Sequence, residues 1–168
     1  MFKKIIMALA VALPLTAAAQ KFGTVQIDNV FSAMPETTEM QNTLNDASKK
    51  YETEFQKLQE ELNKLYTDFQ TIQNDTATPD AIKERRMQEI QDKASKVEQF
   101  RQTATQDLQR QQEQLVAPIQ SKINDAIKAV GTEGSFTLIL PAEPAIILYQ
   151  GADVVDVTPL VKAKLGLK

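Results

Sequence analysis

The sequence contains no cysteine, no histidine and no tryptophan, and it has only 5 glycines among 168 residues. Without cysteine the chain has no disulfide framework, no thiol nucleophile and no N-terminal cysteine that could carry a lipoprotein anchor. Without histidine it lacks the commonest metal ligand and the commonest general base near neutral pH. The sequence also contains no Gly-rich phosphate loop, no metal-ligand spacing and no catalytic constellation. We therefore expect a protein that is not an enzyme and that has no cofactor, no metal site and no catalytic residue.

The first nineteen residues have the three parts of a secretory signal peptide. Lys3 and Lys4 precede an apolar run from Ile5 to Leu15, and three alanines that end at Ala19 follow. This apolar run is shorter than the ~18 residues that a membrane-spanning helix needs. The pattern predicts cleavage after about Ala19 and export to a bacterial periplasm, a compartment without ATP. Cleavage removes two lysines and no acid, so the formal net charge changes from −3 to −5.

The middle of the chain carries a heptad pattern, in which apolar residues recur at alternating steps of three and four. This pattern is typical of a helix that needs a partner helix. Turn-forming residues from Asn74 to Asp80 interrupt it, so we expect two long arms that fold back on each other at this tip. The expected seam between the arms consists of Leu44, Tyr51, Phe55, Leu58, Leu62, Leu65, Phe69, Met87, Ile90, Ala94, Val97, Ala104 and Leu108.

The two arms can be aligned against each other by residue number. Pairing Phe69 with Met87 and Tyr51 with Ala104 keeps the sum of the two residue numbers nearly constant, as an antiparallel pair requires. Large residues then tend to face small ones, which lets the helices pack without voids. The arms are also mildly complementary in charge, because the first is acidic and the second is nearly balanced. This complementarity favours pairing of the arms over nucleic-acid binding.

Proline, threonine and glycine mark the expected ends of the helices. Thr78 is expected to cap the second arm, with Pro79 as its first helical residue. Pro118 lies inside the pattern and predicts a bend, because proline removes a backbone donor and clashes with the preceding turn. Gly131 is expected just past the end of this helix. Thr158 repeats the cap-then-proline start and predicts a final short helix.

Three segments outside the arms have strand-like patterns. Residues 21–27 alternate between polar and apolar. In residues 136–140, Phe136, Leu138 and Leu140 alternate with Thr137 and Ile139, and residues 145–149 form an apolar run bounded by Pro144 and Gly151. Short strands are marginally stable alone, so we expect one shared sheet at the root of the hairpin. The continuous apolar run Ile146-Ile147-Leu148 suggests a strand covered on both faces by a neighbouring subunit. The expected fold class is therefore α+β, a long antiparallel helical hairpin on a small β-sheet body.

The order of these elements resembles the Skp/OmpH family of periplasmic chaperones. The likeness is carried by residues 22–27, by Met34-Pro35-Glu36, by residues 115–127 with their Pro-Ile step, and by the C-terminal segments 136–140 and 156–161. The resemblance implies a jellyfish-like homotrimer, in which coiled-coil tentacles surround a cavity that holds unfolded outer-membrane proteins. It implies a signal peptide at 1–19, a β-rich trimerisation body at 20–35 and 116–168, and a hairpin arm at 36–115 with its tip at 74–80.

Two functions remain open at this point. The first is an ATP-independent holdase chaperone, for which Met40, Tyr66 and Phe100 are candidate client contacts because these apolar residues lie off the seam. The alternative is a structural spacer or adaptor of the cell envelope that uses the hairpin to hold two partners apart. The expected partners are unfolded outer-membrane proteins and further copies of the chain, and not nucleic acid. The acidic balance, with a sequence pI near 5.1, also argues against attraction to anionic membrane surfaces.

Overall fold

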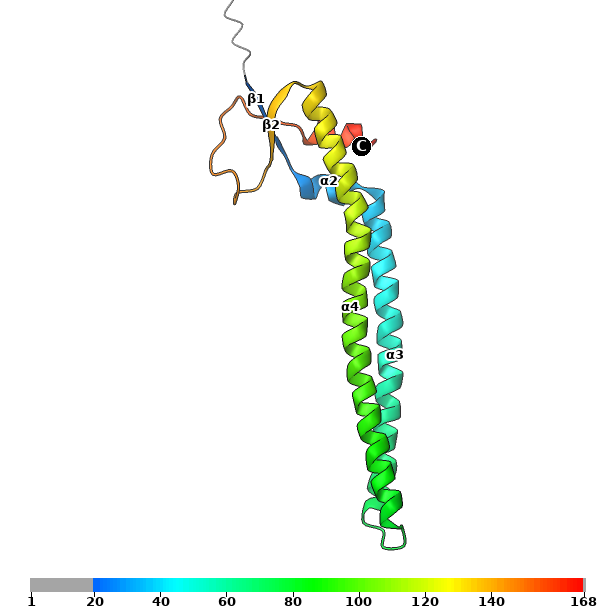
Figure 1. The fold of residues 1–168 in the computed structure, drawn as a ribbon. Helices are drawn as coiled ribbons and strands as arrows, with labels where there is room; N and C mark the ends of the chain where they lie inside the picture. Colours follow the sequence, from blue (N-terminus) through cyan, green and yellow to red (C-terminus); the bar gives the residue numbers. More distant parts are fainter. Residues whose placement is uncertain (1–19, 168) are drawn as a thin grey trace, which may run out of the picture.

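The computed structural model describes residues 20–167, so the expected signal peptide at 1–19 lies outside the described residues. The structure is mostly helical, with two long helices and a small three-stranded sheet (Figure 1). The elements are, in order, β1 (Lys21–Val25), α2 (Ile27–Ala33), α3 (Pro35–Gln73), α4 (Asp80–Glu133), β2 (Phe136–Pro141), β3 (Val155–Asp156) and α5 (Thr158–Lys164). The two ends of the described chain lie together at the root of the long helices.

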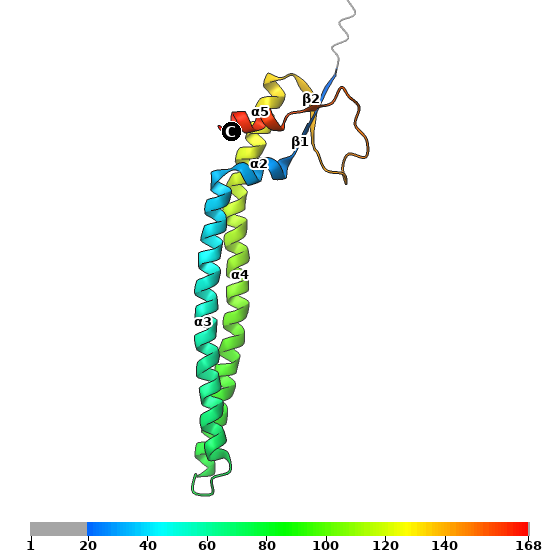
Figure 2. The same ribbon diagram turned by 180° about the vertical axis from the view of Figure 1, so that it is seen from behind.

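Helices α3 and α4 lie side by side and run in opposite directions (Figures 1 and 2). Helix α3 has 39 residues, which at a rise of 1.5 Å per residue gives a length of about 58 Å. It begins at Pro35, where the missing backbone N–H costs nothing because the first N–H groups of a helix have no partner within it. The hairpin therefore extends far beyond the body that holds its two ends.

The tip of the hairpin differs from the expected cap. Helix α4 begins at Asp80, after Pro79, and no side chain caps its first turn. The Thr78 hydroxyl instead donates to the Asp75 carboxylate at 2.6 Å, and the backbone N–H of Ala77 donates to the same carboxylate at 3.0 Å. The prediction of a Thr78 cap was wrong because this hydroxyl closes the tip turn. The bond from Thr78, followed by that from Ala77, holds the pKa of Asp75 below its ordinary value.

Helix α4 continues through two positions at which the sequence predicts a change. It passes Pro118 without a break, and beyond this proline it leans toward the sheet (Figures 1 and 2). It also passes Gly131 and ends at Glu133, so the expected end at Gly131 was wrong. The N–H of Gly134 still bonds to the carbonyl of Val130 at 2.9 Å, and Ser135 then takes the left-handed conformation that turns the chain into β2.

The sheet consists of three parallel strands in the order β2-β1-β3. The predicted strand at 145–149 was wrong, since these residues lie in the loop between β2 and β3. The carbonyl of Glu143 accepts the N–H groups of Ile146 and Ile147 at 2.9 and 2.8 Å, which closes a turn where the strand was expected. The third strand is the two-residue β3, whose pairing occupies the second side of β1. Strand β1 itself ends at Val25, two residues early, because Ile27 begins α2.

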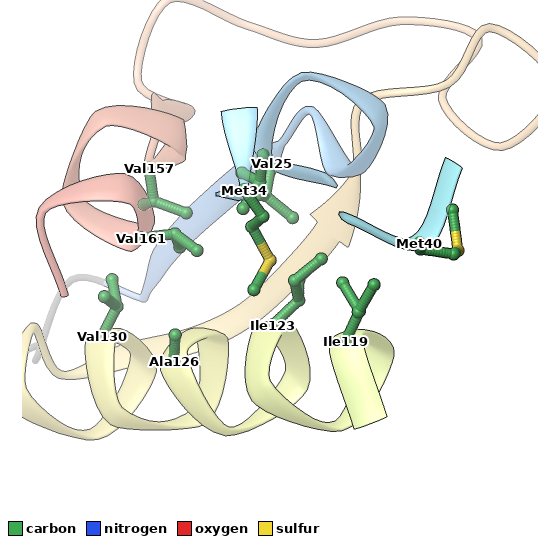
Figure 3. Packing of buried hydrophobic residues seen from close by; sticks show 10 residues of the cluster. Val25, Met34, Met40, Ile119, Ile123, Ala126, Val130, Val157 and Val161 are labelled. Carbon is green, nitrogen blue, oxygen red and sulfur yellow. The ribbon is translucent and has the colours of Figure 1, made fainter. Parts of the chain in front are cut away.

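The core lies between the sheet, the two short helices and the root end of α4 (Figure 3). Its buried members are Val25, Val30, Met34, Met40, Ile119, Ile123, Ala126, Val130, Val157 and Val161. Hydrogen bonds join the two chain ends here, since the N–H of Gln26 donates to the Thr158 hydroxyl at 2.9 Å. The expected Thr158 cap is replaced by Asp156, whose carboxylate accepts the Thr158 N–H at 2.9 Å. The core therefore packs around the ends of α3 and α4 that lie at the root of the hairpin.

Candidate functional site

The seam between α3 and α4 is only partly buried. Of the predicted seam residues, Phe69, Ile90 and Ala104 are buried, and Met87 is 41 % exposed. The others are half-buried: Leu44, Tyr51, Phe55, Leu58, Leu62, Leu65, Ala94, Val97 and Leu108. Two helices contact each other along one line, so they cannot surround seam side chains as a third layer would. The seam side chains are therefore partly exposed to solvent on both sides of the contact between α3 and α4.

A polar bridge crosses the half of the hairpin nearest the body. The Tyr51 hydroxyl of α3 donates to the Asp107 carboxylate of α4, which also accepts a hydrogen bond from Gln111 Nε2 at 2.7 Å. Arg110 pairs with the same carboxylate. The Tyr51 ring also packs against Phe100, with ring centroids 6.0 Å apart. This bridge joins the arms near the expected Tyr51–Ala104 level, where both helices carry small or polar seam residues.

Open grooves flank the seam at this level. One groove of about 500 Å³ is lined by Thr43, Asp46, Ala47, Lys50, Tyr51 and Gln111. A second, of about 420 Å³, is lined by Leu44, Asn45, Ser48, Thr105, Leu108, Gln109 and Gln112. Small side chains such as Ala47 and Ser48 leave the space that Phe and Leu occupy nearer the tip. The seam residues Leu44, Tyr51 and Leu108 therefore line open grooves at this level of the hairpin.

Two ion pairs join the arms, each with an acid on α3 and a base on α4. Lys122 Nζ lies 2.7 Å from a Glu36 carboxylate oxygen, and Lys93 pairs with Glu61. The hydrogen bond from Lys122 is the main cause that lowers the pKa of Glu36, and the bond from Lys93 does the same for the pKa of Glu61. Both pairs follow the charge difference between the arms. Exposed pairs of this kind contribute little to stability, so they orient the arms more than they hold them together.

The three candidate client contacts lie in different surroundings. Met40 is 8 % exposed and belongs to the core, so its expected place on a client surface was wrong. Phe100 is half-buried against Tyr51, which leaves part of one ring accessible. Tyr66 is 45 % exposed, and its hydroxyl makes no hydrogen bond within residues 20–167. Tyr66 is thus the candidate most available to a partner. Met40 is not available, because it belongs to the buried cluster at the root of the hairpin.

The structure also exposes apolar residues that were not among the candidate client contacts. Ile82 near the tip is 46 % exposed, and in the body Phe22, Leu138, Leu148 and Tyr149 are 40 %, 46 %, 93 % and 87 % exposed. The heptad pattern omits Ile82, since it falls off the seam. The exposure of the body residues depends on which strands pair, and the sequence assigned one of those strands wrongly. An apolar run followed by Gln150 and Gly151 was the available signal for the exposed loop.

The basic run near the tip is already paired within its own helix. Arg85 Nε lies 3.2 Å from Glu89, and Arg86 donates to the other oxygen of the same carboxylate at 2.6 Å. Lys83 forms no ion pair within residues 20–167. The tip therefore offers less free positive charge than its sequence suggests.

In the described part of the chain, no helix is both long enough and apolar enough to cross a membrane.

Comparison with known proteins gives consistent matches. Residues 21–165 match the model of a family described as outer membrane protein (OmpH-like). The protein named chaperone protein Skp from Pectobacterium atrosepticum is 28 % identical over 149 residues, which cover 86 % of this chain and 87 % of that protein. The chaperone protein Skp of Yersinia enterocolitica is 26 % identical over 156 residues, which cover 92 % of this chain and 93 % of the relative. The matches include both arms, the sheet and α5.

Proposed function

The chain belongs to the OmpH-like outer membrane protein family, and from this premise we propose that it is an ATP-independent holdase chaperone. It binds unfolded outer-membrane proteins in the periplasm and keeps them from aggregating. The observation that carries this proposal is that relatives named as chaperones align with at least 86 % of this chain. The alignments are long enough to include the arms as well as the body.

The proposal assigns different tasks to the two parts of the chain. Residues 20–35 and 116–168 form the body that associates into a homotrimer, and residues 36–115 form the arm. Three arms then enclose a cavity for the client. Half-buried seam flanks and single exposed residues such as Tyr66 supply many weak contacts. Weak contacts suit a compartment without ATP, because another protein can then compete the client away.

Apolar contact contributes more than charge to client binding in this proposal. The chain is acidic overall, with a formal net charge of −3, and Arg85 and Arg86 already pair with Glu89. Apolar burial is insensitive to moderate salt, whereas attraction between exposed charges is screened over ~8–10 Å at physiological ionic strength. We therefore expect the affinity for an unfolded β-barrel protein to change less than about tenfold between low and high salt.

The test is suppression of aggregation of an unfolded outer-membrane protein on dilution from urea, followed by fluorescence titration. Tyr66→Ser, alone and with Phe100→Ser, should weaken binding more than Lys83→Gln, Arg85→Gln and Arg86→Gln together. Leu160→Ser is the matched control, because Leu160 is 50 % exposed but lies on α5. A larger loss in the charge variant, or loss of binding in salt, would contradict the apolar account. If the parent protein neither binds nor protects the client, the chaperone proposal fails and a structural spacer takes its place.

A further inference from the structure

One side of the hairpin seam carries mostly uncharged polar side chains. In a heptad helix, the residues that border the seam on a given side recur every seven residues. In α3 one such row is Asn45, Glu52, Gln59, Tyr66 and Gln73. The groove of about 420 Å³ brings Asn45 together with Thr105 and Gln112 of α4, so the α4 row that contains these two residues lies on the same side. We call these two rows the amide flank.

The other side of the seam carries the polar contacts that join the arms. Glu61 of α3 pairs with Lys93 of α4, and the Tyr51 hydroxyl donates to the Asp107 carboxylate. Within residues 40–115, every side-chain hydrogen bond or ion pair between α3 and α4 lies on this side. We call its two rows the charged flank, and they contain Glu61 and Asp68 in α3 and Arg86, Lys93, Phe100 and Asp107 in α4.

The amide flank is also the more open of the two sides. The α4 residues just named on the charged flank are all half-buried. The α4 row of the amide flank is exposed throughout, and it consists of Glu84, Gln91, Glu98, Thr105 and Gln112. Glu98 already pairs with Arg101 of its own helix at 2.7 Å. The amide flank therefore presents a row of accessible side chains, most of them uncharged.

The composition of the amide flank differs from that of an ordinary coiled-coil surface. The rows beside a coiled-coil seam often carry Glu and Lys, which form salt bridges across it, and the charged flank follows this rule. The amide flank does not, and the row directly outside it in α3 continues the difference with Asn42, Lys49, Gln56, Asn63 and Gln70. Within residues 42–112, neither the charged flank nor the row directly outside it contains Gln or Asn. This segregation points to a ligand that side-chain amides recognise.

We propose that the amide flank is the surface that binds client, and that it recognises the main chain of an extended, unfolded polypeptide. A Gln or Asn side chain has two N–H donors and one carbonyl acceptor. Each non-proline residue of an unfolded chain presents one N–H and one C=O without a partner in secondary structure. Side-chain amides can pair with both groups whatever the client sequence. The inference rests on the proposed function, to which it adds the side of the arm and the chemical group of the client.

The two remaining candidate client contacts lie on opposite flanks. Tyr66 lies in the amide-flank row, between Gln59 and Gln73, and is 45 % exposed. Its ring offers apolar area beside the amides, and its hydroxyl can bond to a main-chain group. Phe100 lies on the charged flank, where it packs against Tyr51. A client segment that follows the amide flank therefore contacts Tyr66 and not Phe100.

Two single-cysteine variants test which flank the client covers. The chain has no cysteine of its own, so Gln59→Cys on the amide flank and Lys57→Cys on the opposite side can each carry one fluorophore. Residues two apart on a helix point in nearly opposite directions, which matches the labels in position along the arm. With an unfolded β-barrel protein bound, acrylamide quenching of the Gln59→Cys label should fall by about half or more, because an interface excludes solvent from its centre. Quenching of the Lys57→Cys label should not change.

Two other outcomes of the labelling would overturn the inference. Equal protection of both labels, or protection of the Lys57→Cys label alone, would show that the client does not select the amide flank. Protection of the Gln59→Cys label before client is added would show that a neighbouring arm covers this flank instead.

Alanine variants test the chemical group. Gln59→Ala, Gln91→Ala and Gln112→Ala together remove three amides from the flank and keep good helix formers. Three hydrogen bonds of ordinary strength correspond to a loss of client affinity of about tenfold or more. Lys50→Ala, Lys64→Ala and Lys96→Ala together are the matched control, because these exposed lysines lie directly outside the charged flank, and affinity should hardly change. Unchanged helical circular dichroism shows that both variants fold.

The result also separates this inference from the proposed function. Unchanged affinity in the triple glutamine variant, or a larger loss in the triple lysine variant, would overturn the inference and leave a chaperone that binds client by another surface. A parent protein that does not bind the unfolded client would overturn the proposed function and this inference together.

Discussion

The body and the hairpin bury their apolar residues to very different degrees. In the body, Val30, Val157 and Val161 are 0 % exposed and Ile123 is 1 % exposed. In the hairpin, most seam residues are only half-buried, although their sequence pattern is more regular. The difference arises because the body packs helices against a sheet, whereas the hairpin packs one helix against one helix. A regular pattern therefore indicates which residues face each other, and the number of layers decides how far they are buried.

The largest effect is expected in the body. Ile123→Ala should lower the free energy of unfolding by about 2–5 kcal/mol, because it removes a side chain from the centre of the core and leaves a cavity. Urea unfolding followed by circular dichroism measures this change. A loss below about 1 kcal/mol would show that the core can collapse around the site, and would weaken the contrast with the hairpin.

A smaller effect is expected for a seam residue of the same chemical type. Leu62→Ala should cost about 0.8–1.5 kcal/mol, since a half-buried side chain contributes about half of the ~1.5–3 kcal/mol of a fully buried one. The same urea titration gives the value. A cost equal to that of Ile123→Ala would mean that the seam is enclosed in solution, for example by neighbouring arms.

A still smaller effect is expected at the polar bridge. Tyr51→Phe keeps the ring against Phe100 but removes the donor to Asp107, which retains Gln111 and Arg110 as partners. The expected loss is about 0.5–1.5 kcal/mol, the usual net contribution of one hydrogen bond. Tyr66→Phe is the control, because the Tyr66 hydroxyl makes no hydrogen bond in the described part of the chain, and it should change stability little. Equal effects of the two substitutions would show that the hydrogen bond from Tyr51 to Asp107 does not stabilise the hairpin.

The smallest effect concerns the ion pairs between the arms. The pKa values of Glu36 and Glu61 are lowered in the folded chain, mainly by hydrogen bonds from Lys122 and Lys93. Their contribution to stability is present above the ordinary glutamate pKa of ~4.3 and is lost as the pH falls through the lowered folded values. Lys93→Gln should therefore reduce the fall of melting temperature on acidification below about pH 4, with little change at pH 7. An equal fall in the variant and the parent would contradict this role.

The hairpin was predictable from sequence because its order is local. Apolar spacing and the breakers from Asn74 to Asp80 predict two long helices and the tip between them. The body was less predictable, since a strand exists only where another segment pairs with it. Residues 145–149 have strand composition but pair with no strand within residues 20–167, whereas Val155 and Asp156 pair with β1 although they form a strand of only two residues. Met40 was misplaced for a similar reason, because its burial depends on how α4 leans at the root.

The proposed function divides the tasks between the two regions: in this proposal the body assembles and the arms bind client. Hydrogen exchange of the protein with and without an unfolded β-barrel client tests this division most directly. Without client, we expect the slowest exchange around Ile123, Val157 and Val161, and faster exchange along α3 and α4. With client, protection from exchange should increase along the parts of α3 and α4 that contact the client and stay unchanged in the body. Protection that increases only in the body, or nowhere, would contradict the account.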